Sequence, residues 1–215
     1  MAHRLAHILD AAARGAYPDP DGECEVLPSL GAISAMVAFT GHWVIAADVD
    51  PQFVRDRYSD GDYSVPMSAA FLHQLGHEIG AEPKTQDVLL VALSAVGVPS
   101  IELEPLDDFQ HPRVARANRY RRDVRVYTTV DRRGVMILGR GITNRWEVAV
   151  EVEPDAHGQG LGRVLFDAAL RMLPPSTPVW AQVAPGNPAS LRSAQAAGFK
   201  AVGAEVLFVG APQLH

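Results

Sequence analysis

The chain contains a single cysteine, Cys24, in 215 residues, so it cannot form an internal disulfide bond. It also lacks an uninterrupted apolar run of about 18 residues, the length that a membrane-spanning helix needs. Its first fifteen residues carry charged and histidine side chains where a secretory signal would be apolar. We therefore expect a soluble, cytoplasmic protein with no membrane partner.

Positive charge is also scarce. Lys and Arg total 19 against 25 Asp and Glu, and the net charge of −6 argues against nucleic acid as a partner. The exception is a run of arginines within thirteen residues: Arg113, Arg116, Arg119, Arg121, Arg122 and Arg125. Such a run can contact phosphates, but the favoured interpretation is a solvated helix face paired with acids such as Asp107, Asp108 and Asp123.

The remaining composition is that of a globular protein. Apolar residues make up 47% and charged residues 20%, and the length allows one large domain or two small ones. His73 and His77 lie four residues apart on a predicted helix, a spacing that suits metal ligands. Because their neighbours are apolar and no HExxH pattern is present, we expect no metal site.

Apolar periodicity and turn residues predict helices alternating with strands. The predicted helices cover residues 2–14, 68–79, 113–121, 160–172 and 188–197. The predicted strands cover residues 23–27, 32–39, 43–49, 87–92, 124–130, 134–141, 145–152, 179–184 and 204–209. Thr40-Gly41 is a plausible hairpin turn between the second and third strands.

The order of elements suggests an internal duplication. A shift of 103 positions places Trp43 on Trp146 and Pro51 on Pro154 without a gap. We therefore predict two tandem halves, residues 1–105 and 106–215. The first half lacks a glycine-rich loop after Pro51 and carries several acidic residues there, so only the second half is expected to bind an anionic ligand.

The segment richest in chemical information runs from Val148 to Gly162 and reads VAVEVEPDAHGQGLG. It predicts a strand, a turn with Pro154, a glycine-rich loop and then a helix. Glycines let the backbone approach a ligand closely, and the free N–H groups and dipole of the helix start attract phosphate. A Walker loop would end in Gly-Lys-Ser/Thr, and a Rossmann loop would open a parallel βαβ unit. Neither pattern fits this segment.

The segment resembles the phosphate loop of the GNAT acyltransferase superfamily, which reads Gln/Arg-x-x-Gly-x-Gly/Ala after a Val-x-Pro. Here Val152-Glu153-Pro154 is followed by the loop, in which His157 replaces the usual Gln or Arg. The main-chain N–H at this position is still expected to serve the pyrophosphate. The resemblance implies that acetyl-CoA, or another acyl-CoA, is the cosubstrate. It assigns these residues to the binding of that cosubstrate: Val150, Val152, His157, Gly158, Gln159, Gly160, Leu161, Gly162 and Arg163.

A second signature of the same family follows the next predicted strand. Asn187 and Ser190 match Asn-x-x-Ala/Ser, and Gly198-Phe199 closes the motif at the usual spacing. In relatives this asparagine and its helix line the pantetheine arm, so both residues are assigned to cosubstrate binding. The family usually places a tyrosine, the general acid, seven residues after the asparagine; here that position is Ala194.

The resemblance implies an α/β (α+β) fold, with a mixed, mostly antiparallel sheet flanked by helices and two central strands that splay apart. It also implies direct attack of a primary amine on the acyl thioester. N–H groups near Val152 would polarise the thioester carbonyl. A strand carboxylate would take the amine's proton, with Glu147 as the first candidate and Glu151 as the second.

The sequence leaves the acceptor open between a small-molecule amine and a peptide, and a homodimer is one open oligomeric state. The alternative function is a non-catalytic acyl-CoA-binding sensor or regulatory module. Ala194 and the degenerate first half favour that alternative, whereas the Asn187 motif and the available carboxylates favour the enzyme.

Overall fold

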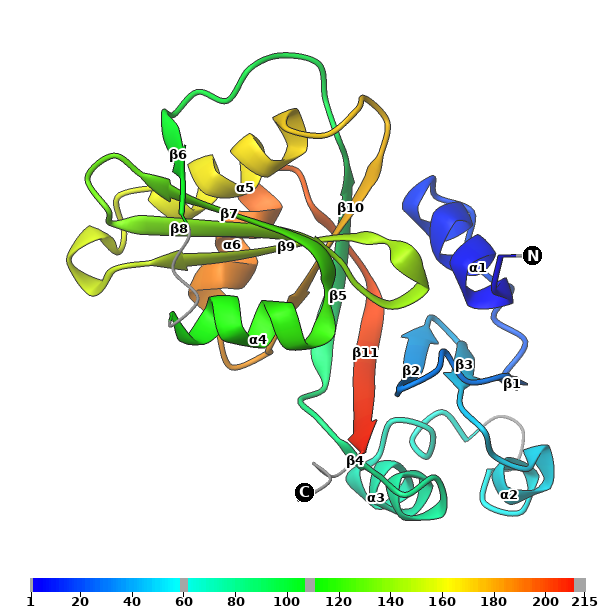
Figure 1. The fold of residues 1–215 in the computed structure, drawn as a ribbon. Coiled ribbons are helices and arrows are strands. Elements are labelled where there is room, and N and C mark those ends of the chain that lie inside the picture. The colour runs from blue at the N-terminus through cyan, green and yellow to red at the C-terminus, as the bar shows by residue number, and fades with distance from the viewer. Residues whose placement is uncertain (1, 59–61, 107–110, 211–215) are drawn as a thin grey trace. The chain divides into compact units, whose positions relative to one another are not determined.

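The structure is a computed structural model that describes residues 2–58, 62–106 and 111–210 (Figure 1). The chain divides into two compact units, residues 1–88 with 202–215 and residues 89–201. In the described part of the chain, no helix is both long enough and apolar enough to cross a membrane. The predicted division at residue 105 stays a prediction.

The first unit is built around a small sheet in which β1, β3, β2 and β11 are neighbours in that order, and β4 pairs with β11. All these pairs are antiparallel except β1 with β3. Its helices are α1 (Arg4–Ala13), α2 (Pro51–Arg55) and α3 (Ala69–Glu78). Its strands are β1 (Cys24–Leu27), β2 (Ile33–Phe39), β3 (His42–Ala46), β4 (Ala81–Pro83) and most of β11 (Lys200–Gly210).

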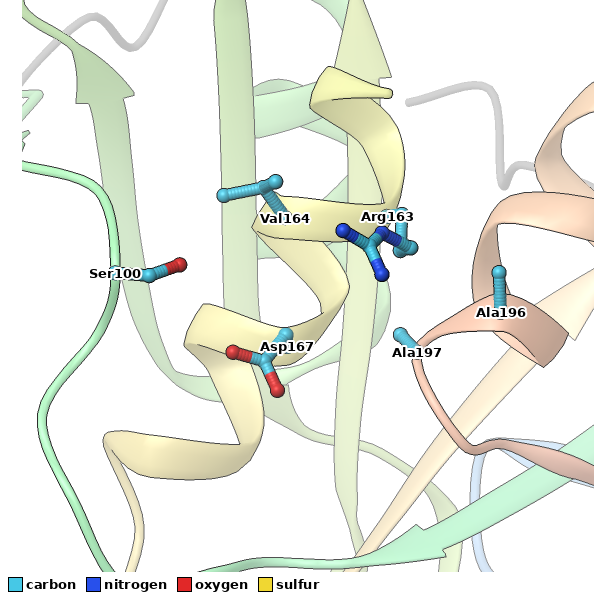
Figure 2. A pocket seen from close by; sticks show the side chains of 6 residues that line it. All are labelled: Ser100, Arg163, Val164, Asp167, Ala196 and Ala197. Atoms are coloured by element: carbon cyan, nitrogen blue, oxygen red, sulfur yellow. The ribbon is translucent and has the colours of Figure 1, made fainter.

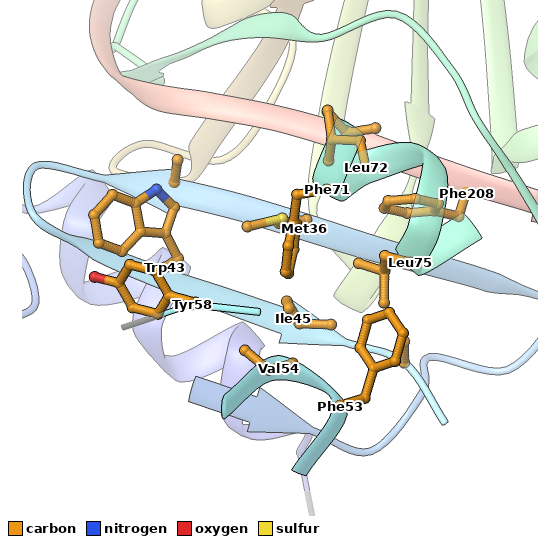
Figure 3. Packing of buried hydrophobic residues seen from close by; sticks show 13 residues of the cluster. Met36, Trp43, Ile45, Phe53, Val54, Tyr58, Phe71, Leu72, Leu75 and Phe208 are labelled. Carbon is orange, nitrogen blue, oxygen red and sulfur yellow. The ribbon is translucent and has the colours of Figure 1, made fainter. Parts of the chain in front are cut away.

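The core of this unit lies between the sheet and the helices α2 and α3 (Figure 3). Met36 and Ile45, which project from β2 and β3, lie in one cluster with Phe53 of α2, Phe71 of α3 and Phe208 of β11. Alternation along the strands places these side chains on one face. The predicted hairpin turn at Thr40-Gly41 joins β2 to β3, and Gly41 has a φ of 64°, which favours glycine.

Helix α3 begins at a serine cap. The Ser68 side chain accepts a hydrogen bond from the Phe71 N–H at 3.2 Å. We expect Ser68→Ala to lower the free energy of unfolding by about 1 kcal/mol, because that N–H loses its acceptor. Urea unfolding followed by circular dichroism measures this change. Thr85→Ala, an exposed position, is the control with an expected change within about 0.5 kcal/mol, and equal effects from both substitutions would contradict the prediction.

The second unit holds a sheet with the strand order β5-β10-β9-β8-β7-β6. Strands β6 to β9 are antiparallel to their neighbours in this series, whereas β10 is parallel to β9. The strands are most of β5 (Asp87–Leu93), β6 (Leu103–Pro105), β7 (Arg122–Thr129), β8 (Gly134–Arg140), β9 (Trp146–Val152) and β10 (Pro178–Val183). The helices are α4 (Pro112–Tyr120), α5 (Leu161–Arg171) and α6 (Pro188–Ala196), with short 3-10 turns at Ile142–Asn144 and Pro154–Ala156.

Helices α4 and α5 cover opposite faces of this sheet. Val135 of β8 packs in a buried cluster with Val114 of α4. The preceding Gly134 faces the other way, since a Cβ placed there would lie 2.8 Å from the Leu165 side chain of α5. Because successive residues of a strand point to opposite faces, odd-numbered residues of β9 such as Glu147 lie on the α4 face.

The sequence predicted this architecture in part. The mixed, mostly antiparallel sheet flanked by helices is confirmed, and each predicted helix and strand has a counterpart. Helix α2 and strands β4 and β6 were not predicted, because three to five residues are too few to show a periodic pattern.

The predicted duplication is not confirmed. The shift of 103 positions would place Val37 opposite Trp43, because Arg140 lies opposite Trp146, yet Ala38 lies there. In addition, β1 is a parallel neighbour of β3, whereas β7 is an antiparallel neighbour of β8. The strands therefore share residue types at matched positions without sharing register or connections.

Candidate acyl-CoA site

The predicted phosphate loop lies between β9 and α5 and is closed by two side chains that turn back onto its start. The His157 ring donates through Nε2 to the Val152 carbonyl at 2.8 Å, and Gln159 donates through Nε2 to the Asp155 carbonyl at 2.8 Å. Gly158 and Gly160 have φ values of 75° and 82°. Side chains disfavour this left-handed region, so these two glycines allow the chain to turn sharply into α5.

The start of α5 presents main-chain donors. Within the described residues, the N–H groups of residues 158–163 donate to no protein acceptor, and the first helical bond there runs from Val164 N–H to the Gly160 carbonyl. A Cβ added at Gly158 or Gly160 would meet no atom within 4 Å. The loop therefore has open space beside Gly158 and Gly160, and the helix dipole adds to the attraction of the free donors for an anion.

One predicted donor is absent from this set. The His157 N–H donates to the Pro154 carbonyl at 3.3 Å inside the 3-10 turn, so it is not available to a pyrophosphate as expected. Residues 158–163 remain the available donors.

Strands β9 and β10 are paired over two positions only. Trp146 lies opposite Val179 and Glu147 opposite Trp180, whereas β9 continues to Val152 and β10 to Val183. On its other edge, β9 is paired with β8 at all seven residues. The two parallel strands therefore part after Glu147, as the resemblance implied.

The direction of the free main-chain groups follows from the β8–β9 ladder. Gly141 N–H donates to the Arg145 carbonyl at 3.0 Å, and Glu153 N–H donates to the Arg133 carbonyl at 2.9 Å. In an antiparallel ladder the bonded positions alternate, so odd-numbered residues of β9 bond to β8. The main-chain groups of Val150 and Val152 therefore point toward the β10 side, beyond the last position at which β10 is paired.

A pocket of about 210 Å³ lies beside the start of α5, between α5 and α6 (Figure 2). Its two charged lining residues are Arg163 and Asp167. Asp167 forms a two-point ion pair with Arg171, at 2.9 and 3.1 Å, which offsets its charge. Since Arg163 forms no ion pair within the described residues, the pocket has an excess of positive charge.

Helix α6 begins at the predicted asparagine. Asn187 Oδ1 accepts a hydrogen bond from the Ser190 N–H at 3.0 Å and caps the helix. The Asn187 amide nitrogen and the Ser190 hydroxyl are the polar groups left for a ligand. Ala194, at the position where the family has tyrosine, is completely buried.

Glu147, the first candidate for the general base, lies in a buried charge network. Its side chain accepts hydrogen bonds from Arg121 Nε, Arg145 Nε and Gln182 Nε2, each at 2.9 Å. Burial raises the pKa of Glu147, but the nearby Arg145 and Arg121 charges outweigh burial, so the net pKa is below its usual value. A carboxylate with these partners is a weak proton acceptor, which argues against catalysis by Glu147.

Glu151, the second candidate, is more accessible. It forms an ion pair with Arg113 of α4, and its side chain is 37% exposed. Alternation places it on the α4 face, while the main chain of its neighbours Val150 and Val152 points toward β10. It can therefore meet a ligand that approaches from the α4 face.

Three residues of the arginine run contact β9. Arg113 and Arg121 pair with carboxylates of this strand, and Arg125 lies 5.0 Å from the ring centroid of Trp146. The expected partners Asp107 and Asp108 lie outside the described residues. The run therefore contributes to the packing of the second unit as well as to its surface.

Arg145 and Gln182 were missed as site residues by sequence reasoning. Arg145 lies two positions and Gln182 thirty-five positions from Glu147, and no spacing rule links the three side chains. Among the described residues, no cluster of three or more His, Cys, Asp or Glu side chains is arranged to hold a metal ion.

Comparisons with known proteins give low similarity. No protein-family model and no curated protein matches the chain. Eleven chains of solved structures match, and three of them are GNAT acetyltransferases that match at probability 1.00. They are an acetyltransferase from the GNAT family of Colwellia psychrerythraea, a GCN5-related N-acetyltransferase from Kribbella flavida and a putative GNAT-family acetyltransferase from Novosphingobium aromaticivorans.

The identities in this order are 12%, 16% and 18%, with TM-scores of 0.41, 0.42 and 0.41. The matches cover 66%, 65% and 61% of this chain and 63%, 63% and 68% of the other chains. The chain thus spans less than two thirds of the length of the first two.

Proposed function

We propose that this protein is an acyl-CoA-dependent N-acyltransferase of the GNAT type, which moves an acetyl or other short acyl group to a primary amine. The observation that carries the proposal is the set of free main-chain donors at residues 158–163, directly after a strand that parts from its parallel neighbour. We call the free N–H groups of residues 158–163 the cradle. A group of anion-binding donors beside two strands that separate suits a cosubstrate with a pyrophosphate at one end and a long, narrow arm.

The cradle binds the pyrophosphate through main-chain N–H groups. Gly158 and Gly160 admit the phosphates, because neither carries a side chain and the space beside each is open, while Gln159 and His157 hold the loop in shape. Gly162 contributes its main-chain N–H and packs against Ser193 of α6. Arg163 adds a cation at the rim of the pocket in Figure 2. Leu161 contributes its main-chain N–H.

The acyl-bearing arm lies along the part of β9 that β10 does not pair. The Val150 and Val152 N–H groups donate to the arm and to the thioester carbonyl, where negative charge develops as the amine attacks. The Asn187 amide and the Ser190 hydroxyl contact the arm from α6. These contacts orient the thioester so that the amine reaches it from the α4 face.

Proton transfer is the role of Glu151 in this proposal. It accepts the proton of the attacking amine, directly or through a water molecule. Glu147 stays charged in its arginine network and does not take part. No tyrosine stands at the Ala194 position, and a thiol with a pKa near 8.5 can leave as the thiolate without an obligatory donor.

The second candidate function is an acyl-CoA-binding module without turnover, favoured by the buried Ala194 and by the engaged carboxylate of Glu147. Release of free thiol from acetyl-CoA, measured with a panel of small amines and amino-terminal peptides, separates the two functions. Amine-dependent release that falls at least tenfold in Glu151→Gln supports the enzyme. Tight acetyl-CoA binding with no release by any amine supports the binding module. The cytoplasmic location and a possible homodimeric state stay predictions.

Arg163 gives a direct test of the cradle's charge. We expect Arg163→Ala to weaken acetyl-CoA binding about tenfold, because one charge-assisted contact to phosphate is lost. The loss should shrink as salt is raised, since salt screens exposed charges. Arg192→Ala, which removes an exposed arginine from α6, is the matched control with unchanged affinity. Equal weakening by both variants would contradict a specific role for Arg163.

A further inference from the structure

The buried network around Glu147 joins three parts of the second unit. Arg121 ends helix α4, Arg145 immediately precedes β9, and Gln182 belongs to β10. The Glu147 side chain is 6% exposed and that of Arg145 is 5% exposed. Both carboxylate oxygens have partners: Oε2 accepts from Arg121, and Oε1 accepts from Arg145 and Gln182.

The network lies at the point where β9 and β10 separate. Glu147 and Trp180 form the last main-chain pair between the strands. Gln182 is two residues further along β10, on the same face, where no ladder bond exists. The Gln182 amide nevertheless bridges to Glu147 at 2.9 Å, and its oxygen lies 3.5 Å from Arg121 Nη2. Side-chain bonds thus continue the link between the strands for one step after the main-chain ladder ends.

Two glycines at the end of the neighbouring strand β8 leave room for the side chains of this network. A Cβ added at Gly141 would lie 2.1 Å from Glu147 Oε1, and one added at Gly139 would lie 3.1 Å from the Arg121 Cβ. Gly139 is the second-last residue of β8, and Gly141 follows the strand in an extended conformation. Neither glycine is needed for a turn, so the lack of space for a side chain is the reason for glycine at both positions. The carboxylate and its arginines are therefore closely fitted to their surroundings.

We propose that Glu147, Arg121, Arg145 and Gln182 form a clamp that fixes where β9 parts from β10, and so positions the Val150 and Val152 N–H groups for the acyl-CoA arm. This inference rests on the proposed function. In it, Glu147 is a positioning residue and not a catalytic one. Without the Gln182 bridge, the separation between the strands is no longer fixed at Glu147, and the donors on β9 lose their orientation.

The test uses Gln182→Leu in the full chain, because leucine keeps most of the volume and removes both bridging bonds. Amide hydrogen exchange of residues 148–152 and 181–183, measured without any ligand, reports the strand separation. We expect exchange in these segments to change at least threefold and the acetyl-CoA dissociation constant to rise about tenfold. Ile137→Val is the control for lost stability, since it trims the core of β8 and leaves the clamp intact.

The outcomes separate the clamp from the proposed function. Changed exchange and affinity in Gln182→Leu, with neither change in Ile137→Val, support the clamp. Unchanged exchange at 148–152, or the same exchange change in both variants, overturns it even if the native chain binds acetyl-CoA. Failure of the native chain to bind acetyl-CoA overturns the proposed function, and the clamp's role in positioning donors for that ligand falls with it.

Discussion

Glu147→Gln is expected to lower the free energy of unfolding by about 3–5 kcal/mol, because it removes the buried negative charge that Arg121 and Arg145 both contact. Glutamine matches glutamate in shape, so the loss reports charge and not a cavity. Arg121 and Arg145 both donate to this carboxylate at 2.9 Å, and the Arg145 and Glu147 side chains are 5% and 6% exposed. Urea unfolding at pH 7 measures the difference.

The same substitution has a pH signature. Since the folded state lowers the Glu147 pKa, the carboxylate stabilises the fold above its unfolded pKa of about 4.3. That contribution is lost as the pH falls through the lower folded pKa. The gap in stability between the native chain and Glu147→Gln should therefore narrow below about pH 4.

The matched control is Glu82→Gln, because Glu82 pairs with Lys84 at 3.7 Å and its side chain is 79% exposed. An exposed ion pair contributes at most about 1 kcal/mol. A loss below about 1 kcal/mol in Glu147→Gln, or equal losses in both variants, would show that the buried network stabilises the fold no more than an exposed ion pair does.

Gly160→Asp is expected to weaken acetyl-CoA binding at least about 100-fold, or roughly 2.7 kcal/mol. The new carboxylate would stand among the donors that face the pyrophosphate and would repel it. A Cβ at this position meets no atom within 4 Å, so the substitution adds charge and the backbone strain of a positive φ, but no steric clash. Isothermal titration calorimetry measures the affinity.

The control for this variant is Gly31→Asp. Gly31 also has a positive φ, at 99°, and a Cβ there also meets no atom within 4 Å. It lies outside the cradle, so it should leave the affinity unchanged. Retained binding by Gly160→Asp would show that the phosphate does not lie at this helix start.

Much of the fold was predictable because long elements have a strong periodic signal. Helix α5 shows an apolar stripe that includes Leu165 and Ala168, and the structure buries both. The loop glycines could also be predicted, since the positive φ values at Gly158 and Gly160 favour glycine. These features are local, and a local feature leaves its pattern in consecutive residues.

The features that escaped prediction are those set by distant contacts. Glu147 looked like an available carboxylate because a strand pattern gives its face and not its partners. Arg121 lies 26 residues away and Gln182 lies 35 residues away, and the fold brings them together. The His157 N–H was misassigned for a related reason, since the 3-10 turn that uses it is only three residues long.

The suggested duplication shows that identical residue types at matched positions are weak evidence for a structural repeat. Trp43 and Trp146 both lie in buried strands, where few residue types are suitable. Their cross-strand partners differ in register, and similar burial by itself accounts for the match of residue types, so the duplication is not confirmed.

The most direct test of the central claim is calorimetric titration of acetyl-CoA into the purified native protein. We expect saturable binding of about one molecule per chain, with an affinity that falls as salt rises, because the described residues hold one phosphate cradle and its attraction is partly electrostatic. Absence of binding heat at any temperature tested, together with no shift in the melting temperature at millimolar acetyl-CoA, would contradict it.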